Sequence, residues 1–180
     1  MLVAYIIMLV IGIASSMLGA LPFGLVNMTV FNVSLEQGNR PALNISFGAS
    51  LVEVLFGLTA ILAGGLLAEY IEGNQVISYF IVAVLLAGGL FFFIKKHGDA
   101  ITRNTTYSGF FTGIFLNLVS IQVFLYWILA IAFLSTRQLM QYDLLSILIF
   151  ISGIWIGKMT VLLLYMSLSR KLLSGSRVIS

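Results

Sequence analysis

Two ionisable residues of opposite charge, Glu53 and Lys158, each lie near the middle of a long apolar run. An ionisable side chain in membrane hydrocarbon costs roughly 3 kcal/mol or more, and it persists where it faces a bundle interior, a partner or a wet cavity. Glu53 is therefore either a carboxylate that binds protons or substrate, or half of a structural ion pair with Lys158. The small residues Gly153 and Gly157 precede Lys158 and let another helix approach closely, so we expect Lys158 to face protein, as a counter-charge or as a substrate contact.

Amide side chains form a second group of candidates. Asn27, Asn117 and Gln122 all lie within apolar segments. Polar bonds between helices in membranes average only about 0.6 kcal/mol, so stability alone explains these residues weakly. We expect Asn27 and Asn117 to converge with Glu53 and Lys158 on one internal site near the middle of the membrane, with Gln122 as a further member. The alternative is that the amides only link neighbouring helices.

The elements that carry these residues follow from the hydropathy of the chain. Of 180 residues, 61% are hydrophobic and 8% are charged, and the mean hydropathy is +1.13. The apolar runs match the ~20 residues that a membrane span needs, and long runs without alternation predict helices. We therefore expect one all-α transmembrane domain over residues 1–180. Five transmembrane helices are predicted within residues 2–35, 42–68, 76–94, 109–134 and 144–168.

The first of these segments is too long for one straight span. At 1.5 Å per residue it would extend about 50 Å, against a hydrocarbon core of about 30 Å. Pro22 lies within it, between Gly19 and Gly24. A proline removes one helical hydrogen bond and clashes with the preceding turn. We expect a first helix that is broken or kinked near Pro22, with free backbone groups at Pro22 and Gly24 facing the site. The alternative is a tilted helix that tolerates the proline.

The basic residues are distributed unevenly between the polar connectors. Of nine Lys and Arg residues, Lys158 lies inside an apolar run and only Arg137 lies in the fourth connector. The other seven lie in the first, third and C-terminal polar segments: Arg40, Lys95, Lys96, Arg103, Arg170, Lys171 and Arg177. The positive-inside rule then predicts an outside N-terminus and a cytoplasmic C-terminus. Basic residues at span ends favour anionic membrane lipids as partners over nucleic acid.

A weak internal repeat relates the two halves of the chain. Residues 26–35 align with residues 116–125, so that Asn27 corresponds to Asn117. The two stretches would enter the membrane in opposite directions, and the following spans carry Glu53 and Lys158. This pattern is typical of a 3+3 inverted repeat, with halves of about residues 1–94 and 109–180 and a site at the midplane. If the repeating unit is three helices, we expect the second half to be one helix short, with a final polar segment similar to a connector leading to a sixth span.

At this point the chain resembles the lysine-exporter family (LysE, with the homoserine/threonine exporters of the RhtB type). The resemblance rests on LPFGLVN at residues 21–27, QGNRPA at 37–42, GASLVE at 48–53, and the Asn-containing and aromatic stretch within 109–127. These are similar to the family's Pro-Gly-Pro-like break, its basic connector, its acid-bearing second helix and its Asn-Pro-like element. The chain departs from that pattern at Leu25 and Leu118, where the family has proline, and in the absence of the usual last span.

The resemblance implies export of amino acids or related small metabolites across the bacterial inner membrane, driven by a proton or ion gradient. A non-transporting subunit or scaffold, assembling through its small-residue helix faces with itself or with other chains, is the alternative. An enzyme is disfavoured, because the chain has no cysteine and its only histidine, His97, lies outside the apolar runs. We expect neither a metal centre nor a cofactor. A transporter should line a water-reachable cavity with the polar set, whereas a scaffold should bury it dry.

Overall fold

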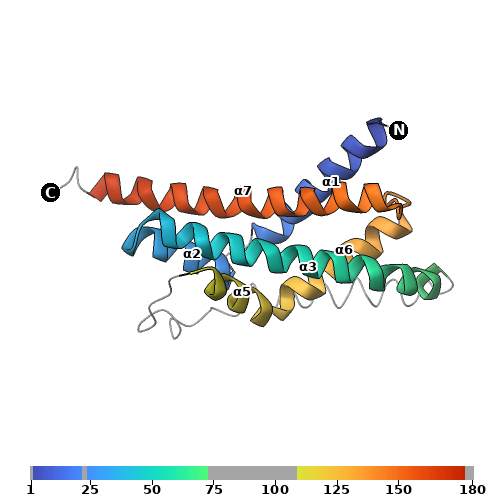
Figure 1. The fold of residues 1–180 in the computed structure, drawn as a ribbon, viewed down its shortest axis with the longest axis horizontal. Helices are drawn as coiled ribbons and strands as arrows, with labels where there is room; N and C mark the ends of the chain where they lie inside the picture. Colours follow the sequence, from blue (N-terminus) through green and yellow to red (C-terminus); the bar gives the residue numbers. More distant parts are fainter. Residues whose placement is uncertain (1, 22–23, 73–108, 177–180) are drawn as a thin grey trace.

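The computed structural model describes residues 2–21, 24–72 and 109–176. Within these ranges the ordered elements are all helices, and no strand occurs among them (Figure 1). The helices are α1 (Leu2–Ala20), α2 (Leu25–Glu36), α3 (Asn39–Glu72), α5 (Phe110–Val119), α6 (Ile121–Thr136) and α7 (Leu144–Ser176). The prediction of an all-α membrane protein is confirmed at this level.

Three of the described helices are long and apolar enough to cross a membrane. They are α1, residues Asn39–Ala63 of α3, and residues Leu144–Lys171 of α7. The pair α5 and α6 forms a fourth candidate if it is counted as one broken span. The predicted span at 76–94 and the basic connector at 95–108 lie outside the described residues. Up to four of the five predicted spans therefore have a counterpart among the described helices.

The first predicted span is divided, as its excess length indicated. Helix α1 ends at Ala20, and α2 begins at Leu25 after Gly24, whose φ of −93° and ψ of 168° are extended rather than helical. Pro22 lies in this interval, where it lacks the N–H that would continue the helix. The alternative of one tilted, continuous helix is wrong for this segment.

The predicted helix at 109–134 is also divided, which the sequence did not indicate through any proline or glycine. Helices α5 and α6 meet at Ser120 with a bend of 68°. The Ser120 hydroxyl bonds to the carbonyl of Leu116 at 2.8 Å, and its N–H bonds to the carbonyl of Asn117 at 3.1 Å. A serine that bonds back to its own helix competes with the helical ladder, which weakens the helix at this point. In the predicted repeat, Ser120 corresponds to Val30, where α2 is uninterrupted, so the repeat is not confirmed.

Helix α3 lies at the centre of the bundle and contacts α2, α5, α6 and α7, while α1 packs along α7 (Figure 1). Glycines allow the closest crossings. A Cβ atom at Gly48 would collide with the Phe110 carbonyl of α5, and one at Gly153 would lie 2.6 Å from the Leu9 carbonyl of α1. The small-residue face predicted on α7 is therefore covered by α1 of the same chain.

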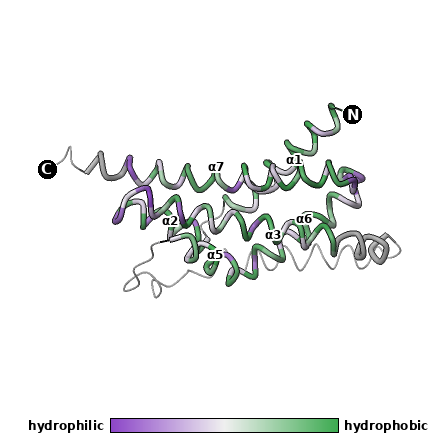
Figure 2. Tube along the Cα trace, viewed as in Figure 1, coloured by the Kyte–Doolittle hydropathy of each residue, from purple (hydrophilic) through white to green (hydrophobic). Residues whose placement is uncertain are grey.

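Polar contacts join the helices at one end of the bundle. Arg170 Nε donates to Asn39 Oδ1 at 2.9 Å, and Ser169 donates to the Ser34 hydroxyl at 3.0 Å. These bonds join the turn between α2 and α3 to the C-terminal part of α7, and Figure 2 shows this turn as a hydrophilic segment at the end of apolar helices. The loop that contains Arg137 lies at the opposite end of α7 (Figure 1). The Arg40 connector and Arg170 thus share one end, as the basic pattern requires.

Candidate functional site

Glu53 and Lys158 meet in the interior of the bundle. Lys158 Nζ lies 2.8 Å from Glu53 Oε2, and the two side chains are only 4% and 2% exposed, respectively. The pair joins α3 to α7 near the middle of two long apolar helices. Two charges removed from water offset each other here, because either one alone would carry a large desolvation penalty. Sequence reasoning identified both residues from that same penalty.

A third helix reaches this pair through a residue that the sequence analysis missed. The hydroxyl of Ser16 in α1 donates to Glu53 Oε1 at 3.0 Å and is completely buried. Each carboxylate oxygen therefore has its own partner, from α1 and from α7. A signal was available in the sequence, since the buried residues of α1 recur every four positions and three of them are small: Met8, Gly12, Ser16 and Ala20. That stripe predicts the face that contacts α7.

Asn27 lies beside the break in the first span. Its Nδ2 donates to the Ala20 carbonyl at 2.5 Å, while the Tyr165 hydroxyl of α7 donates to the Leu21 carbonyl at 2.9 Å. The last carbonyls of a helix have no partner within it, so side chains must satisfy them when the helix end is buried. Asn27 and Tyr165 do this for α1. Tyr165 is the second contributor that sequence reasoning missed.

Asn117 lies on the other side of the ion pair, where α5 packs on α3. Its Nδ2 donates to the Ala49 carbonyl at 2.6 Å, and the side chain is fully buried. Ala49 is one helical turn before Glu53, so Asn117 approaches the acidic residue without contacting it in a hydrogen bond. Asn27 is similarly one turn removed, because Ala20 follows Ser16 by four residues.

The remaining predicted residues are less closely associated with the pair. Gln122 is half-buried at the start of α6, and within the described ranges no hydrogen bond joins it to Glu53 or Lys158. Gly24 precedes the first residue of α2, and Pro22 lies outside the described residues. Gly24 therefore belongs to the break in the first span, and its backbone does not contact the ion pair through any described hydrogen bond.

The second break lies alongside the turn of α3 that carries Glu53. Before the break, Asn117 contacts Ala49; after it, the Phe124 ring lies 5.3 Å from the Phe56 ring. The break at Ser120 falls between these two contacts, so it lies beside the part of α3 between residues 49 and 56. The first break follows Ser16 by about one turn. Two interrupted helices thus flank one buried ion pair, an arrangement in which helix ends supply polar backbone groups inside a membrane.

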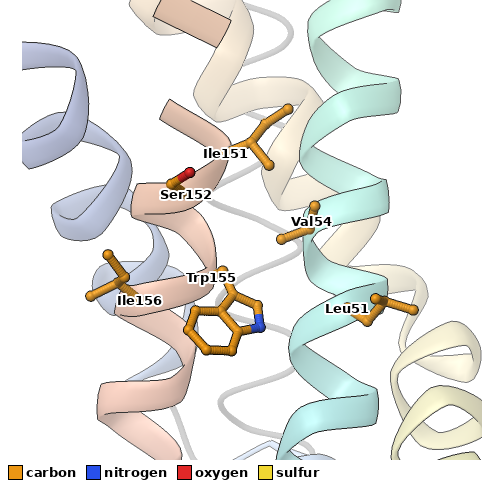
Figure 3. Close-up of a pocket in the computed structure, with 6 residues that line it drawn as sticks. All are labelled: Leu51, Val54, Ile151, Ser152, Trp155 and Ile156. Carbon is orange, nitrogen blue, oxygen red and sulfur yellow. The ribbon is translucent and has the colours of Figure 1, made fainter. Parts of the chain in front are cut away.

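A groove on the outer surface has different chemistry. It measures about 340 Å³ and lies between α3 and α7, where Figure 3 shows the Trp155 ring beside Leu51 and Val54. Its other lining residues are Ile151, Ser152 and Ile156. No ionisable residue lines it, and the Ser152 hydroxyl is bonded to the Leu148 carbonyl of its own helix. Such a surface fits lipid acyl chains rather than a hydrophilic solute.

Comparison with known proteins gives one match. The model of the LysE type translocator family matches residues 17–177, which include both helix breaks and the ion pair. Searches of curated proteins and of solved structures gave no match.

Proposed function

This chain belongs to the LysE type translocator family, and we propose that it is a secondary transporter that exports amino acids or related small zwitterions. Membership makes it a multi-pass membrane translocator and not an enzyme. The substrate, the direction and coupling to a proton or ion gradient are our proposal. The observation that carries it is the buried pair of Glu53 and Lys158, which α1, α3 and α7 enclose together.

A buried ion pair is a poor device for stability alone. Replacing such a pair by well-packed apolar residues is often neutral or stabilising by about 1–4 kcal/mol, because the desolvation penalty exceeds the attraction. The pair is therefore better explained by recognition of a charged ligand. A zwitterion would present an ammonium group to Glu53 and a carboxylate to Lys158. The internal pair would open as two matched pairs form, so no charge would be left uncompensated in the interior.

Access to the site requires movement of helices, because the pair is enclosed in this conformation. The contacts of Arg170 with Asn39, and of Ser169 with Ser34, hold one end closed. The breaks after Ala20 and at Ser120 divide α1 from α2 and α5 from α6, so each half can tilt separately. Alternating access by such broken helices around a fixed site is common among secondary transporters.

The membrane arrangement forms part of the same proposal. We place the chain in the bacterial inner membrane with five spans, counting residues 76–94, and with the halves 1–94 and 109–180 as an inverted repeat. The end that carries Arg40 and Arg170 is cytoplasmic, and the N-terminus is outside. The closed end would then be the cytoplasmic gate.

The enclosed polar set is what the scaffold alternative expects, but that alternative is not favoured on other grounds. It requires small-residue faces that are available to other subunits. The glycines that allow close helix approach are instead covered within the chain. Gly12 of α1 and Gly153 of α7 lie where these two helices cross, and Gly48 and Gly113 lie where α3 and α5 cross.

Efflux from vesicles tests the function directly. Purified protein would be reconstituted into liposomes loaded with radiolabelled amino acids of small, cationic and apolar types, with imposed pH or sodium gradients or with none. We expect gradient-dependent efflux of at least one type above that of protein-free vesicles. Efflux no faster than in protein-free vesicles under every gradient would contradict the proposal. The Thr160→Val variant, at an exposed position of α7, serves as the folded control.

A further inference from the structure

Ser50 is an exception among the hydroxyl residues of the helices. Seven serines and threonines in the described ranges donate to the carbonyl four residues earlier in the chain, as is common in membrane helices. This group comprises Thr29, Ser46, Thr59, Ser120, Ser135, Ser152 and Thr160. Ser50 Oγ is fully buried and has no hydrogen-bond partner among the described residues. Its hydroxyl therefore does not make the bond to the Ser46 carbonyl that this pattern would give.

Asn117 has a second such atom. Its Oδ1 is buried and lacks a hydrogen-bond partner within the described part of the chain. The orientation of the amide is fixed, because the Ala49 carbonyl accepts hydrogen bonds and must face Nδ2 at 2.6 Å. The oxygen therefore points elsewhere and offers an acceptor only. An unsatisfied buried polar atom costs about 1–3 kcal/mol and indicates a missing partner.

Around the axis of α3, Ser50 and Ala49, the residue that Asn117 contacts, lie on either side of Glu53. Successive helical residues are about 100° apart, so Glu53 projects roughly 40° from Ala49 and roughly 60° from Ser50 around the axis of α3. Asn117 contacts α3 at Ala49, and Ser50 lies on the opposite flank. The Ala49 carbonyl is also the helical partner of the Glu53 N–H, which places the Asn117 amide beside the turn that leads to Glu53.

We propose that Ser50 Oγ, Asn117 Oδ1 and the Glu53 carboxylate form a subsite for the primary ammonium group of the transported molecule. An –NH3+ group has three donors, and these three residues offer three acceptors. In the structure, Lys158 supplies an ammonium group to Glu53 in place of that ligand. The inference rests on the proposed transport function. It adds that the transporter selects a primary ammonium group on its substrate. A quaternary ammonium group has no N–H and cannot satisfy Ser50 or Asn117.

Binding to the purified full chain tests the subsite without transport. The protein in lipid nanodiscs would be titrated with L-alanine, L-lysine and L-leucine, and with the Nα-trimethyl form of each, while tryptophan fluorescence is recorded. Trp127 is a suitable reporter because it packs near Gly57, one turn beyond Glu53. We expect at least one amino acid to bind, and its trimethyl form to bind at least about tenfold more weakly, since hydrogen bonds to a charged group are lost. Equal binding of the two forms, or no binding of any amino acid, would overturn the proposal.

Variants assign the effect to the named atoms. Ser50→Ala and Asn117→Leu should each weaken binding of the primary ammonium form by about tenfold or more, with little change for the trimethyl form. Ser50→Thr keeps a hydroxyl and should retain the preference. Ser46→Ala is the matched control, because the Ser46 hydroxyl is already bonded to the Ala42 carbonyl. Size-exclusion chromatography would show whether each variant is folded. If folded Ser50→Ala binds amino acids like the unmodified protein, the subsite is wrong, and this holds even where Asn117→Leu fails to fold.

Failure of the subsite and failure of the transport proposal give different results. Efflux that is equally fast for primary and quaternary forms would leave the transporter intact and remove the subsite. Selective binding without any gradient-driven efflux would retain the subsite and remove the transport function. Replacing sodium by potassium at constant ionic strength should leave binding unchanged. Loss of the primary-ammonium signal on adding sodium would assign the oxygens to a metal cation instead, and would overturn the proposal.

Discussion

Ser16 donates a 3.0 Å hydrogen bond to Glu53 Oε1, so the carboxylate that pairs with Lys158 on α7 is also tied to α1. A carboxylate with both oxygens occupied by buried partners is fixed in orientation. Ser16 is four residues before Ala20, where α1 ends at the first break. Movement of α1 at that break would therefore alter the environment of Glu53, which couples the position of a helix to the state of the ion pair.

Ser16→Ala should reveal this positioning role. The change leaves Glu53 Oε1 buried without its donor, and we expect a loss of about 1–3 kcal/mol in the free energy of unfolding. Efflux should also slow, and its pH dependence should change. The amount of protein in the membrane should remain close to that of the unmodified protein. Ser16→Thr, which keeps a hydroxyl, should recover part of the pH dependence. A purely structural role is indicated if stability falls while the pH profile of efflux is unchanged.

The ion pair and the first break were both accessible from the sequence, and for the same kind of reason. Glu53 and Lys158 are rare charges in apolar runs, and the cost of leaving either in lipid forces them inward. Pro22 lies in a segment too long for one span, and its missing N–H predicts the interruption that separates Ala20 from Leu25. In each case one residue type carries a penalty large enough to decide the outcome.

The hydrogen-bond partners of Ser16, Ser50 and Ser120 could not be predicted from the sequence. A serine in a membrane helix can bond to its own backbone at little cost, so its type alone does not determine its partner. Ser120 bends its span and Ser46 does not, although both bond four residues back. The difference depends on how α5 and α6 pack on α3, which is a property of the assembled bundle.

Gly157→Val should separate α1 from α7 beside the ion pair. A Cβ atom at Gly157 would lie 2.6 Å from the Ile13 carbonyl and 2.9 Å from Ser16 Cβ. Overpacking of this kind typically costs about 1–3 kcal/mol. We expect a lower melting temperature in detergent and slower efflux, because Ser16 moves away from Glu53. Thr160→Val, on the exposed side of the same helix, should change neither, and equal melting temperatures for the two variants would show that the close approach is not required.

The orientation of the bundle can be read by single-cysteine labelling, since the chain contains no cysteine. Gln37 is exposed at the end that carries Arg40, and Thr136 is exposed near Arg137 at the other end. A membrane-impermeant thiol reagent added outside intact cells should label Thr136→Cys and leave Gln37→Cys unlabelled until the cells are opened. The reverse pattern would place the basic end outside. That result would refute the proposed orientation, in which the gate at this end is cytoplasmic.

Asp143 gives a pH-dependent contribution at the start of α7. The Ser146 side chain, and then the Ser146 backbone N–H, which donates to Asp143 Oδ2 at 3.0 Å, lower the pKa of Asp143 below its usual value. A lowered pKa in the folded state stabilises the protein above the unfolded pKa of about 3.9, and this stabilisation is lost as the pH falls through the folded value. Asp143→Ala should therefore lower the melting temperature at pH 7 by more than at pH 3. An equal difference at the two pH values would exclude the ionised carboxylate as the cause.

Exchanging the two charges separates recognition from structure. Glu53→Gln should abolish gradient-driven efflux, and Lys158→Met should do the same, with a stability loss of up to about 3–5 kcal/mol where an unpaired charge remains buried. The double variant Glu53→Lys with Lys158→Glu restores a pair between α3 and α7. We expect it to regain stability, measured as a double-mutant cycle in detergent, because the two charges again offset each other.

Efflux should not return in the exchanged variant, because the proposed ammonium subsite needs the Glu53 carboxylate as one of its acceptors. A lysine ammonium group at position 53 would occupy the Asn117 acceptor in place of the ligand, and the new carboxylate would lie on α7, away from the Ser16 hydroxyl that now bonds to Glu53. The ion pair would then be present, but the positive charge would lie on α3 and the negative charge on α7, the reverse of the unmodified protein. Efflux at the unmodified rate from the exchanged variant would mean that only the attraction between the helices matters. That result would reassign Glu53 and Lys158 to a structural role and would favour a binding site elsewhere along the broken helices.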